Sequence, residues 1–444
     1  MLRALTTAPL PVTLVILSFL CPTELSLFLG GLRLPPHRIA LIVLFPIVIY
    51  RLLFTRKVRL QGFDLVFFAF NIWTVAVFTH HSGAPDGLVY GGSLALESLG
   101  AYLVARTYVR DFETLRNSLK VMLMAIAAAA VIALPETLLG QNFAHDFMRA
   151  LTGYEHPIGN ETRLGLTRAY STFDHPIHYG TFCAGLLTLF LYAERRFNRR
   201  IGRGALVGGA TFLGLSSAPM LCLALQFSMI MWDWLTRGIR SRALMTFALI
   251  AGAFIGVSLI SDRGPVGIIA TGLTLDSWTG YYRMQIWTNG LKSVWNHPWT
   301  GIGLADWDRP WWMVSDTIDA FWLVIAMREG IPALILLALA IAMLVMAAVS
   351  RGLSTPDRET HHILRGWIIS LIALCMIGAT VHFWNVLYAY FFFFLGLGGV
   401  LADPMRRKPK RSAEQAAGAN KNSKPRIRRA PKRPRKPVPE AVWA

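Results

Sequence analysis

Charged residues are scarce in this chain, at 16% of its 444 residues, and acidic residues are the rarer kind, with 25 Asp and Glu against 44 Lys and Arg. Hydrophobic residues make up 54% of the chain, and the mean hydropathy is +0.46. So little charge cannot cover the water-exposed surface of a globular protein of this size. The composition therefore excludes a soluble protein and indicates one that lies in a membrane.

Cysteine is also rare, and the four cysteines lie in or beside apolar segments without the spacing of metal ligands. We therefore expect no disulfide framework and no zinc site. The chain has no P-loop and no dinucleotide-binding fingerprint. No small-residue cleavage site follows its first apolar run, so we expect that run to be retained as a membrane span.

Apolar segments of up to about 20 residues, the length that crosses a hydrocarbon core of ~30 Å, recur along the chain. Their backbone groups must form hydrogen bonds within the segment, which requires helices. We predict an all-α polytopic membrane protein of about 12 transmembrane helices. The predicted spans are Leu10–Phe28, Ile39–Phe54, Phe63–His80, Leu88–Ala105, Leu119–Leu139, His178–Ala193, Ala205–Leu215, Met220–Trp234, Ala243–Ile260, Ile331–Val349, Gly366–Val381 and Phe383–Leu401.

Alternate short loops between these spans are rich in Lys and Arg, which marks the cytoplasmic side of a membrane protein. Both termini are then cytoplasmic, and two long loops, Gly140–Asp174 and Ser261–Asp319, face outward. Among the short outer turns, the one that carries Arg33 and Arg38 departs from this pattern. Within the fourth span, Glu97 is the clearest intramembrane charge, and we expect it to pair with Arg106.

The last 40 residues differ in composition from the rest: from Met405 onward, 14 Lys and Arg stand against Glu414 and Glu440, with several prolines between them. Such a segment cannot bury a core. We divide the chain into a transmembrane domain, residues 1–404, and a disordered basic cytoplasmic tail, residues 405–444. We expect the tail to lie on anionic lipid, and do not favour nucleic acid as its partner.

Five short motifs follow one another in and beside the two outer loops. They are T-R-A-Y-S-T-F-D-H-P-I-H-Y-G (Thr167 to Gly180), R-M-Q-I-W (Arg283 to Trp287), H-P-W-T-G-I-G (His297 to Gly303), D-A-F-W-L (Asp319 to Leu323) and R-E-G-I-P (Arg328 to Pro332). Eight of the 14 tryptophans lie between Trp278 and Trp322. Cations beside aromatic rings suit a ligand that is part phosphate and part sugar.

The order of these motifs resembles the O-antigen ligase and polymerase superfamily, which are bacterial inner-membrane proteins. The resemblance covers about Arg163 to Leu334. It implies inverting glycosyl transfer on the periplasmic side, from an undecaprenyl-pyrophosphate-linked oligosaccharide to a sugar hydroxyl, without a metal or other cofactor. A chain-length regulator is a candidate partner. The motif D-W-D (Asp306 to Asp308) is like the metal-binding pair of nucleotide-sugar transferases, but a three-residue match is weak evidence for a metal.

The resemblance assigns the arginines of these motifs to the pyrophosphate, because guanidinium groups are permanently charged and bind phosphate with two parallel hydrogen bonds. Arg283 matches the family's second-loop arginine and Arg168 the arginine before the sixth span. Arg163 and Arg263 are weaker candidates for substrate binding. The alternative is that these arginines only contact lipid headgroups.

The general base is harder to assign. The ligase branch usually has histidine closely followed by asparagine at the start of the helix after the second loop, where this chain has Asp319. This departure favours a polymerase over a ligase. We expect Asp319, or next Asp316, to accept the proton of the acceptor hydroxyl, although aspartate near a helix start is often only an N-cap. His175 is a further candidate for catalysis.

For substrate binding we also name His178, Trp311 and Trp312. The predicted function is polymerisation of lipid-linked repeat units in exopolysaccharide or O-antigen synthesis. Two alternatives stay open: an O-antigen ligase that transfers glycan to lipid A-core, and a transporter or flippase of lipid-linked glycan. Transporters tend to have polar or broken spans at the membrane midplane, whereas the polar motifs here collect outside the spans.

Overall fold

The computed structural model describes residues 6–29, 32–55, 58–154, 157–159, 161–239, 245 and 277–403. The chain divides into two units, Met1–Pro404 and Met405–Ala444. The basic tail and the predicted span Ala243–Ile260, apart from residue 245, lie outside the described residues.

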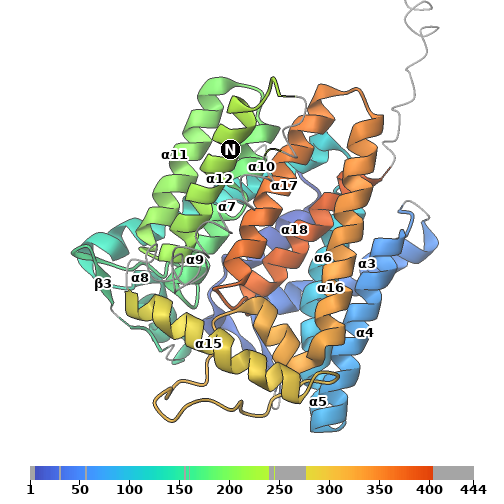
Figure 1. The fold of residues 1–444 in the computed structure, drawn as a ribbon. Coiled ribbons are helices and arrows are strands. Elements are labelled where there is room, and N and C mark those ends of the chain that lie inside the picture. The colour runs from blue at the N-terminus through green and yellow to red at the C-terminus, as the bar shows by residue number, and fades with distance from the viewer. Residues whose placement is uncertain are drawn as a thin grey trace, which may run out of the picture. The chain divides into compact units, whose positions relative to one another are not determined.

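Within these ranges the first unit is mostly helical, as the all-α prediction requires (Figure 1). Its only strands among the described residues form two short antiparallel hairpins. The elements are α2 (Leu10–Ser18), η1 (Thr23–Leu25), β1 (Leu27–Leu29), β2 (Leu32–Leu34), α3 (Pro36–Phe54), α4 (Gly62–Ser82), α5 (Asp86–Ala95), the π-turn η2 (Leu96–Gly100), α6 (Ala101–Tyr108), α7 (Phe112–Leu139), α8 (Phe143–Thr152), β3 (Thr162–Arg163), β4 (Leu166–Thr167), α9 (Pro176–Ala184), α10 (Leu187–Ala193), α11 (Phe197–Leu213), α12 (Ser217–Leu235), α15 (Ser277–Asn296), α16 (Phe321–Ser354), α17 (Arg358–Gly378) and α18 (Val386–Ala402).

Eight helical segments in the described part of the chain are long and apolar enough to cross a membrane. The protein is therefore a multi-pass membrane protein, while the count of twelve spans stays a prediction. The predicted first span, Leu10–Phe28, is shorter than expected, because α2 ends at Ser18 and Pro22 precedes η1 and the β1–β2 hairpin. Proline lacks an N–H and cannot continue a helical hydrogen-bond ladder at this point.

The helix α18 lies at the centre of the bundle, and every one of its 17 residues is buried. A helix that is apolar on all sides must be covered on all sides, and α18 contacts α6, α9, α16 and α17. Small residues allow this close packing. A Cβ on Gly396 would lie 2.3 Å from the carbonyl oxygen of Tyr102, and one on Gly398 would lie 2.3 Å from the ring of Trp367.

The prediction that Glu97 pairs with Arg106 is wrong. Glu97 forms an ion pair with Arg38 at 2.8 Å, whereas Arg106 pairs with Asp64 at 3.1 Å and also with Asp403. Glu97 lies in the π-turn η2 and Arg106 lies nine positions later in α6, and the two side chains bond to different helices, α3 and α4. Each buried charge therefore finds a partner on a different helix.

A sharp kink at Gly330 divides α16, and two of the sequence motifs meet there. Gly330 has φ 82° and ψ 171°, which frees the carbonyl groups of the preceding turn from the helix ladder. Segment 298–303 satisfies them: the N–H of Ile302 donates to the carbonyl of Met327 at 2.8 Å, and that of Gly303 to Arg328 at 3.0 Å. The motifs H-P-W-T-G-I-G and R-E-G-I-P thus form one packing unit that fixes the start of α16.

Gly330→Ala tests this unit. The backbone of Gly330 lies in a region that is essentially restricted to glycine, and a Cβ would lie 2.0 Å from the carbonyl oxygen of Trp299. We expect a loss of about 3 kcal/mol of stability, seen as a lower midpoint of thermal unfolding in detergent. Gly209→Ala is the control, because a Cβ on this exposed α11 glycine meets nothing within 4 Å. Equal unfolding midpoints for both variants would contradict the packing unit.

Candidate functional site

Part of the second predicted outer loop is a helix, α15, which lies across one end of the bundle at a steep angle to the spans (Figure 1). Buried residues recur along it every three or four positions, which is the period of one helix face. They include Arg283, Ile286, Asn289 and Val294. On that face a Cβ on Gly290 would lie only 2.8 Å from the side chain of Leu323 in α16. This face turns Arg283 toward the bundle.

Arg168 follows the β3–β4 hairpin and is only 3% exposed. Its guanidinium donates to Ser216 Oγ at 2.9 Å and forms an ion pair with Glu161. Its Nε has no hydrogen-bond partner among the described residues. Ser216 is the N-cap of α12, at the end of the connection from α11, so this connection holds the Arg168 side chain in place.

The segment after Arg168 is anchored to the spans by hydrogen bonds. Ser171 has a φ of 55°, a conformation that non-glycine residues rarely adopt, and its N–H donates to the buried carboxylate of Glu136 at 2.7 Å. Its hydroxyl donates to the carbonyl of Ala129 at 2.9 Å. These two contacts with α7 fix the turn between Arg168 and His175.

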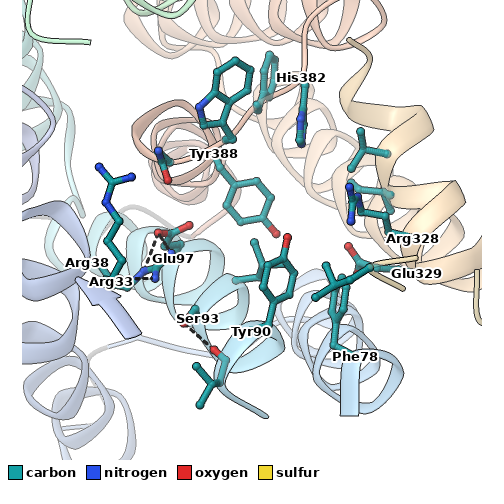
Figure 2. A pocket seen from close by; sticks show the side chains of 18 of the residues that line it. Arg33, Arg38, Phe78, Tyr90, Ser93, Glu97, Arg328, Glu329, His382 and Tyr388 are labelled. Carbon is teal, nitrogen blue, oxygen red and sulfur yellow. Dashed lines mark hydrogen bonds and ion pairs between the residues drawn. The ribbon is translucent and has the colours of Figure 1, made fainter. Parts of the chain in front are cut away.

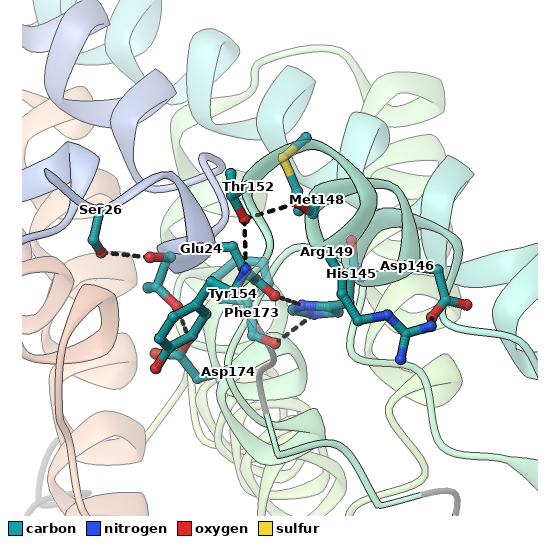
Figure 3. A network of polar contacts seen from close by, with 12 residues as sticks. Glu24, Ser26, His145, Asp146, Met148, Arg149, Thr152, Tyr154, Phe173 and Asp174 are labelled. Carbon is teal, nitrogen blue, oxygen red and sulfur yellow. Dashed lines mark hydrogen bonds and ion pairs between the residues drawn. The ribbon is translucent and has the colours of Figure 1, made fainter.

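A second network of polar contacts holds the end of the same segment (Figure 3). His145 of α8 pairs with Glu24 of η1, and its Nε2 lies 3.2 Å from the carbonyl of Phe173. Asp174 accepts hydrogen bonds from Thr23 and, at 2.7 Å, from Asn385. Four parts of the chain that are far apart in sequence therefore converge beside His175.

The structure brings Arg163, Arg168 and Arg283 close enough for their charges to act on one another. Burial lowers the pKa of Arg283, and the positive charges of Arg163 and Arg168 lower it further, while Asp319 opposes them. Arg283 is 9% exposed, and its Nε has no hydrogen-bond partner in the described part of the chain. We call Arg163, Arg168, Arg283, Asp319 and His175 the arginine cluster.

His175 is the N-cap of α9, and its Nδ1 accepts a hydrogen bond from the N–H of Ile177 at 3.1 Å. Burial, helped by the charge of Arg168, lowers its pKa to about 4, so the ring is neutral at neutral pH. A neutral imidazole whose Nδ1 accepts must carry its proton on Nε2. His175 can therefore donate a hydrogen bond to a ligand, but it has no free nitrogen to act as a base.

Asp319 precedes α16, but it is not the helix cap: the N-cap residue is Ala320, which has no side-chain capping bond. Burial raises the pKa of the Asp319 carboxyl, although Arg283 opposes the shift. A raised pKa makes the carboxylate a stronger base at neutral pH. Asp316, the second candidate, is exposed, and its carbonyl accepts the indole N–H of Trp307 at 3.0 Å.

The other predicted residues lie in different places, and Arg263 is outside the described residues. His178 is buried in α9, where its ring contacts Trp384 with 3.7 Å between centroids. Trp312 lies near the rings of Tyr281 and Tyr282. Trp311 is 93% exposed, beside other residues of its own segment. Their assignment to substrate binding stays a prediction.

Next to the arginine cluster lies a cavity of about 630 Å³ that the sequence did not reveal (Figure 2). Trp384 connects the two, because it lines the cavity and its ring centroid lies 6.3 Å from that of His175. Burial, helped by the charge of Arg328, lowers the pKa of His382 in the same wall to about 4. Two features of the sequence could have pointed to this cavity. One is the segment H-F-W-N (His382 to Asn385) near the junction of the last two apolar spans, and the other is the presence of Arg33 and Arg38 on the side that is poor in cations.

Among the described residues, no group of three or more His, Cys, Asp or Glu side chains is placed to hold a metal ion. Asp306 of the D-W-D motif forms an ion pair with Arg309. Comparison with protein-family models and with curated proteins finds no match to this chain.

Because the pKa of His175 is lowered in the folded protein, the stability of the protein should depend on pH. Its folded pKa, about 4, is below the ordinary 6.5, so the unfolded chain binds more protons between these values and stability rises with pH across this window. His175→Asn keeps a good N-cap residue but cannot titrate. We expect its unfolding midpoint to fall less than that of the parent between pH 7 and pH 5. An equal fall would show that His175 is not buried in its neutral form.

Proposed function

We propose that the arginine cluster is the active site of a periplasmic-face glycosyltransferase, which polymerises undecaprenyl-pyrophosphate-linked oligosaccharide repeat units. The observation that carries this proposal is that Arg283 of α15 lies near Arg163 in the β3–β4 hairpin and near Arg168 directly after it. Arg168 pairs with Glu161, whose side chain is mostly exposed, and Asp319 lies near Arg283. Guanidinium groups gathered in this way suit an anionic ligand such as a diphosphate.

Burial argues against simple contact with lipid headgroups. An arginine that serves a headgroup extends its guanidinium into the interface, whereas Arg168 and Arg283 are 3% and 9% exposed. Holding like charges together away from water costs free energy unless a ligand neutralises them. Such arrangements are found mainly at functional sites.

The reaction can be written with these residues. The acceptor hydroxyl gives its proton to Asp319 as its oxygen attacks the anomeric carbon of the donor sugar. The bond between that carbon and the diphosphate oxygen breaks, the configuration inverts, and the lipid diphosphate leaves with the bonding electron pair. Arg168 and Arg283 stabilise the negative charge that develops on the leaving group, and His175 Nε2–H donates a further hydrogen bond.

Under this proposal the α15 end of the bundle faces the periplasm of a bacterial inner membrane and both termini are cytoplasmic. The arginine-rich connections, including that between α16 and α17, lie at the opposite end (Figure 1). That distribution supports the orientation, because Lys and Arg in short loops stay on the cytoplasmic side. The twelve-span count and the interaction of the basic tail with anionic lipid belong to the same proposal.

Reconstitution of the full chain in liposomes tests the function. Given lipid-diphosphate repeat units on the outer face, the protein should produce a ladder of longer glycans. Arg283→Lys keeps the charge but loses the planar fork, so we expect the rate to fall about 100-fold. Arg149→Lys on α8 is the control, because this exposed arginine pairs only with Asp146, one turn away, among the described residues. Unchanged product formation by Arg283→Lys would contradict the diphosphate role.

Other products would identify the alternatives. Glycan found on a different lipid acceptor would indicate a ligase. Unaltered substrate on the far side of the bilayer would indicate a transporter. Either result would replace the polymerase proposal.

Asp319→Asn separates proton transfer from donor binding. The amide cannot accept the proton, so we expect the turnover rate to fall by about 100-fold or more. Removing a negative charge beside Arg283 should leave the affinity for the lipid-diphosphate donor unchanged or increase it. The measurement is kcat and the KM for the donor, each determined for Asp319→Asn and for the parent protein over a range of pH. A raised KM at an unchanged kcat would assign Asp319 to binding and not to catalysis.

A further inference from the structure

We infer that the cavity beside the arginine cluster binds a neutral sugar residue of the acceptor glycan, and that Arg328 hydrogen-bonds its hydroxyl groups. This inference rests on the proposed function, since it names the substrate class of a second subsite. The cavity, of about 630 Å³, is large enough for a sugar ring and is walled by parts of β2, α3, α5, α16 and residues 382–388.

The cavity lining carries acidic as well as basic side chains, which distinguishes it from the arginine cluster. It contains three arginines, Arg33, Arg38 and Arg328, and three acidic residues, Asp86, Glu97 and Glu329. In the arginine cluster, by contrast, three of the five residues are arginines and one, Asp319, is acidic. A ligand part without net charge therefore suits the cavity, whereas an anionic part suits the cluster.

Two of the three arginines that line the cavity already bond to other groups of the protein. Arg33 donates to the carbonyl of Thr23 at 3.0 Å and to Ser26 Oγ at 3.1 Å. Arg38 forms its ion pair with Glu97, which also bonds His37. These contacts connect the β1–β2 hairpin and α3 to the bundle, so both arginines have a structural role in the cavity wall.

Arg328 is different. Among the described residues it has no carboxylate within ion-pair distance, and it donates to the carbonyl of Gly303 at 3.3 Å, which is long for such a bond. Its neighbour Glu329 accepts a hydrogen bond from Thr74 of α4, and the Glu329 carbonyl accepts the indole N–H of Trp73 at 2.9 Å. The kink at Gly330 thus fixes the backbone beneath Arg328 while leaving most of its donors for a ligand.

Aromatic side chains supply the other half of a sugar site. The hydroxyl ends of Tyr90 and Tyr388 point toward each other across the middle of the cavity (Figure 2), and Trp384 lies in the same wall. Asn385 and Ser93 add polar atoms to the lining. Aromatic faces cover the apolar C–H face of a sugar, while planar polar groups such as guanidinium and amide bind its hydroxyls.

The cavity is also in the right place for an acceptor. Phe321, in its wall, is two residues from Asp319, and its N–H donates to the carbonyl of Val381 at 3.1 Å. Trp384 contacts both His175 and His178. A sugar in the cavity would therefore present a hydroxyl near the carboxylate that accepts its proton and near the diphosphate site.

Binding measurements on the purified full chain in nanodiscs test this inference. The sugar probes are methyl glycosides of glucose, galactose, mannose and N-acetylglucosamine, with methyl glucuronide as the acidic counterpart, followed by saturation-transfer NMR. Inorganic pyrophosphate, followed by calorimetry, probes the arginine cluster. We expect Arg328→Gln and Tyr90→Leu each to weaken binding of the preferred neutral glycoside about tenfold and to leave pyrophosphate binding unchanged. Arg283→Lys should do the reverse.

Arg149→Gln and Tyr50→Leu are the matched controls, because both residues are exposed and neither lines the cavity. Neutral-glycoside binding that is unchanged in both cavity variants would overturn the inference. So would tighter binding of the glucuronide, or no neutral glycoside bound at millimolar concentration. Failure of the proposed function would look different: the parent protein would bind the neutral glycoside but not pyrophosphate.

Discussion

Burial of guanidinium groups away from water is the constraint on which the proposed site depends. Arg163 and Arg168 lie in and directly after one hairpin and Arg283 comes from α15, so only the fold brings the third arginine to the other two. Burial is the main cause of the lowered pKa of Arg283 and of the neighbouring His175, and the charges of nearby arginines add to both shifts. Under the proposed function, binding of a polyanion relieves the cost of burying these charges.

Contacts from several parts of the fold position the residues of the arginine cluster. Glu136 and Ser216 hold the segment that carries Arg168, while His145, which pairs with Glu24, bonds to the same segment at the carbonyl of Phe173. The docking of segment 298–303 on the kink at Gly330 sets the start of α16, and with it Asp319 and Arg328. Under the proposed function and the further inference, the arginine cluster binds a diphosphate and the neighbouring cavity binds a sugar.

The sequence predicted the helical class and the multi-pass character, because apolar length alone determines both. The motifs and the family resemblance also singled out Arg163, Arg168, Arg283, Asp319 and His175, which the fold places near one another, while their roles stay predictions. The sequence did not predict α15, whose buried face is partly polar, and it paired Glu97 with the wrong arginine. The cavity could not be predicted, because its walls come from several separate parts of the chain and only the fold brings them together.

A structure determined by cryo-electron microscopy with an undecaprenyl-pyrophosphate-linked glycan bound would test the central claim most directly. We expect density for the diphosphate within hydrogen-bonding reach of Arg168 and Arg283, with the first sugar turned toward Asp319. Density for the diphosphate at the opposite end of the bundle, or at the lipid-facing surface away from α15, would contradict it.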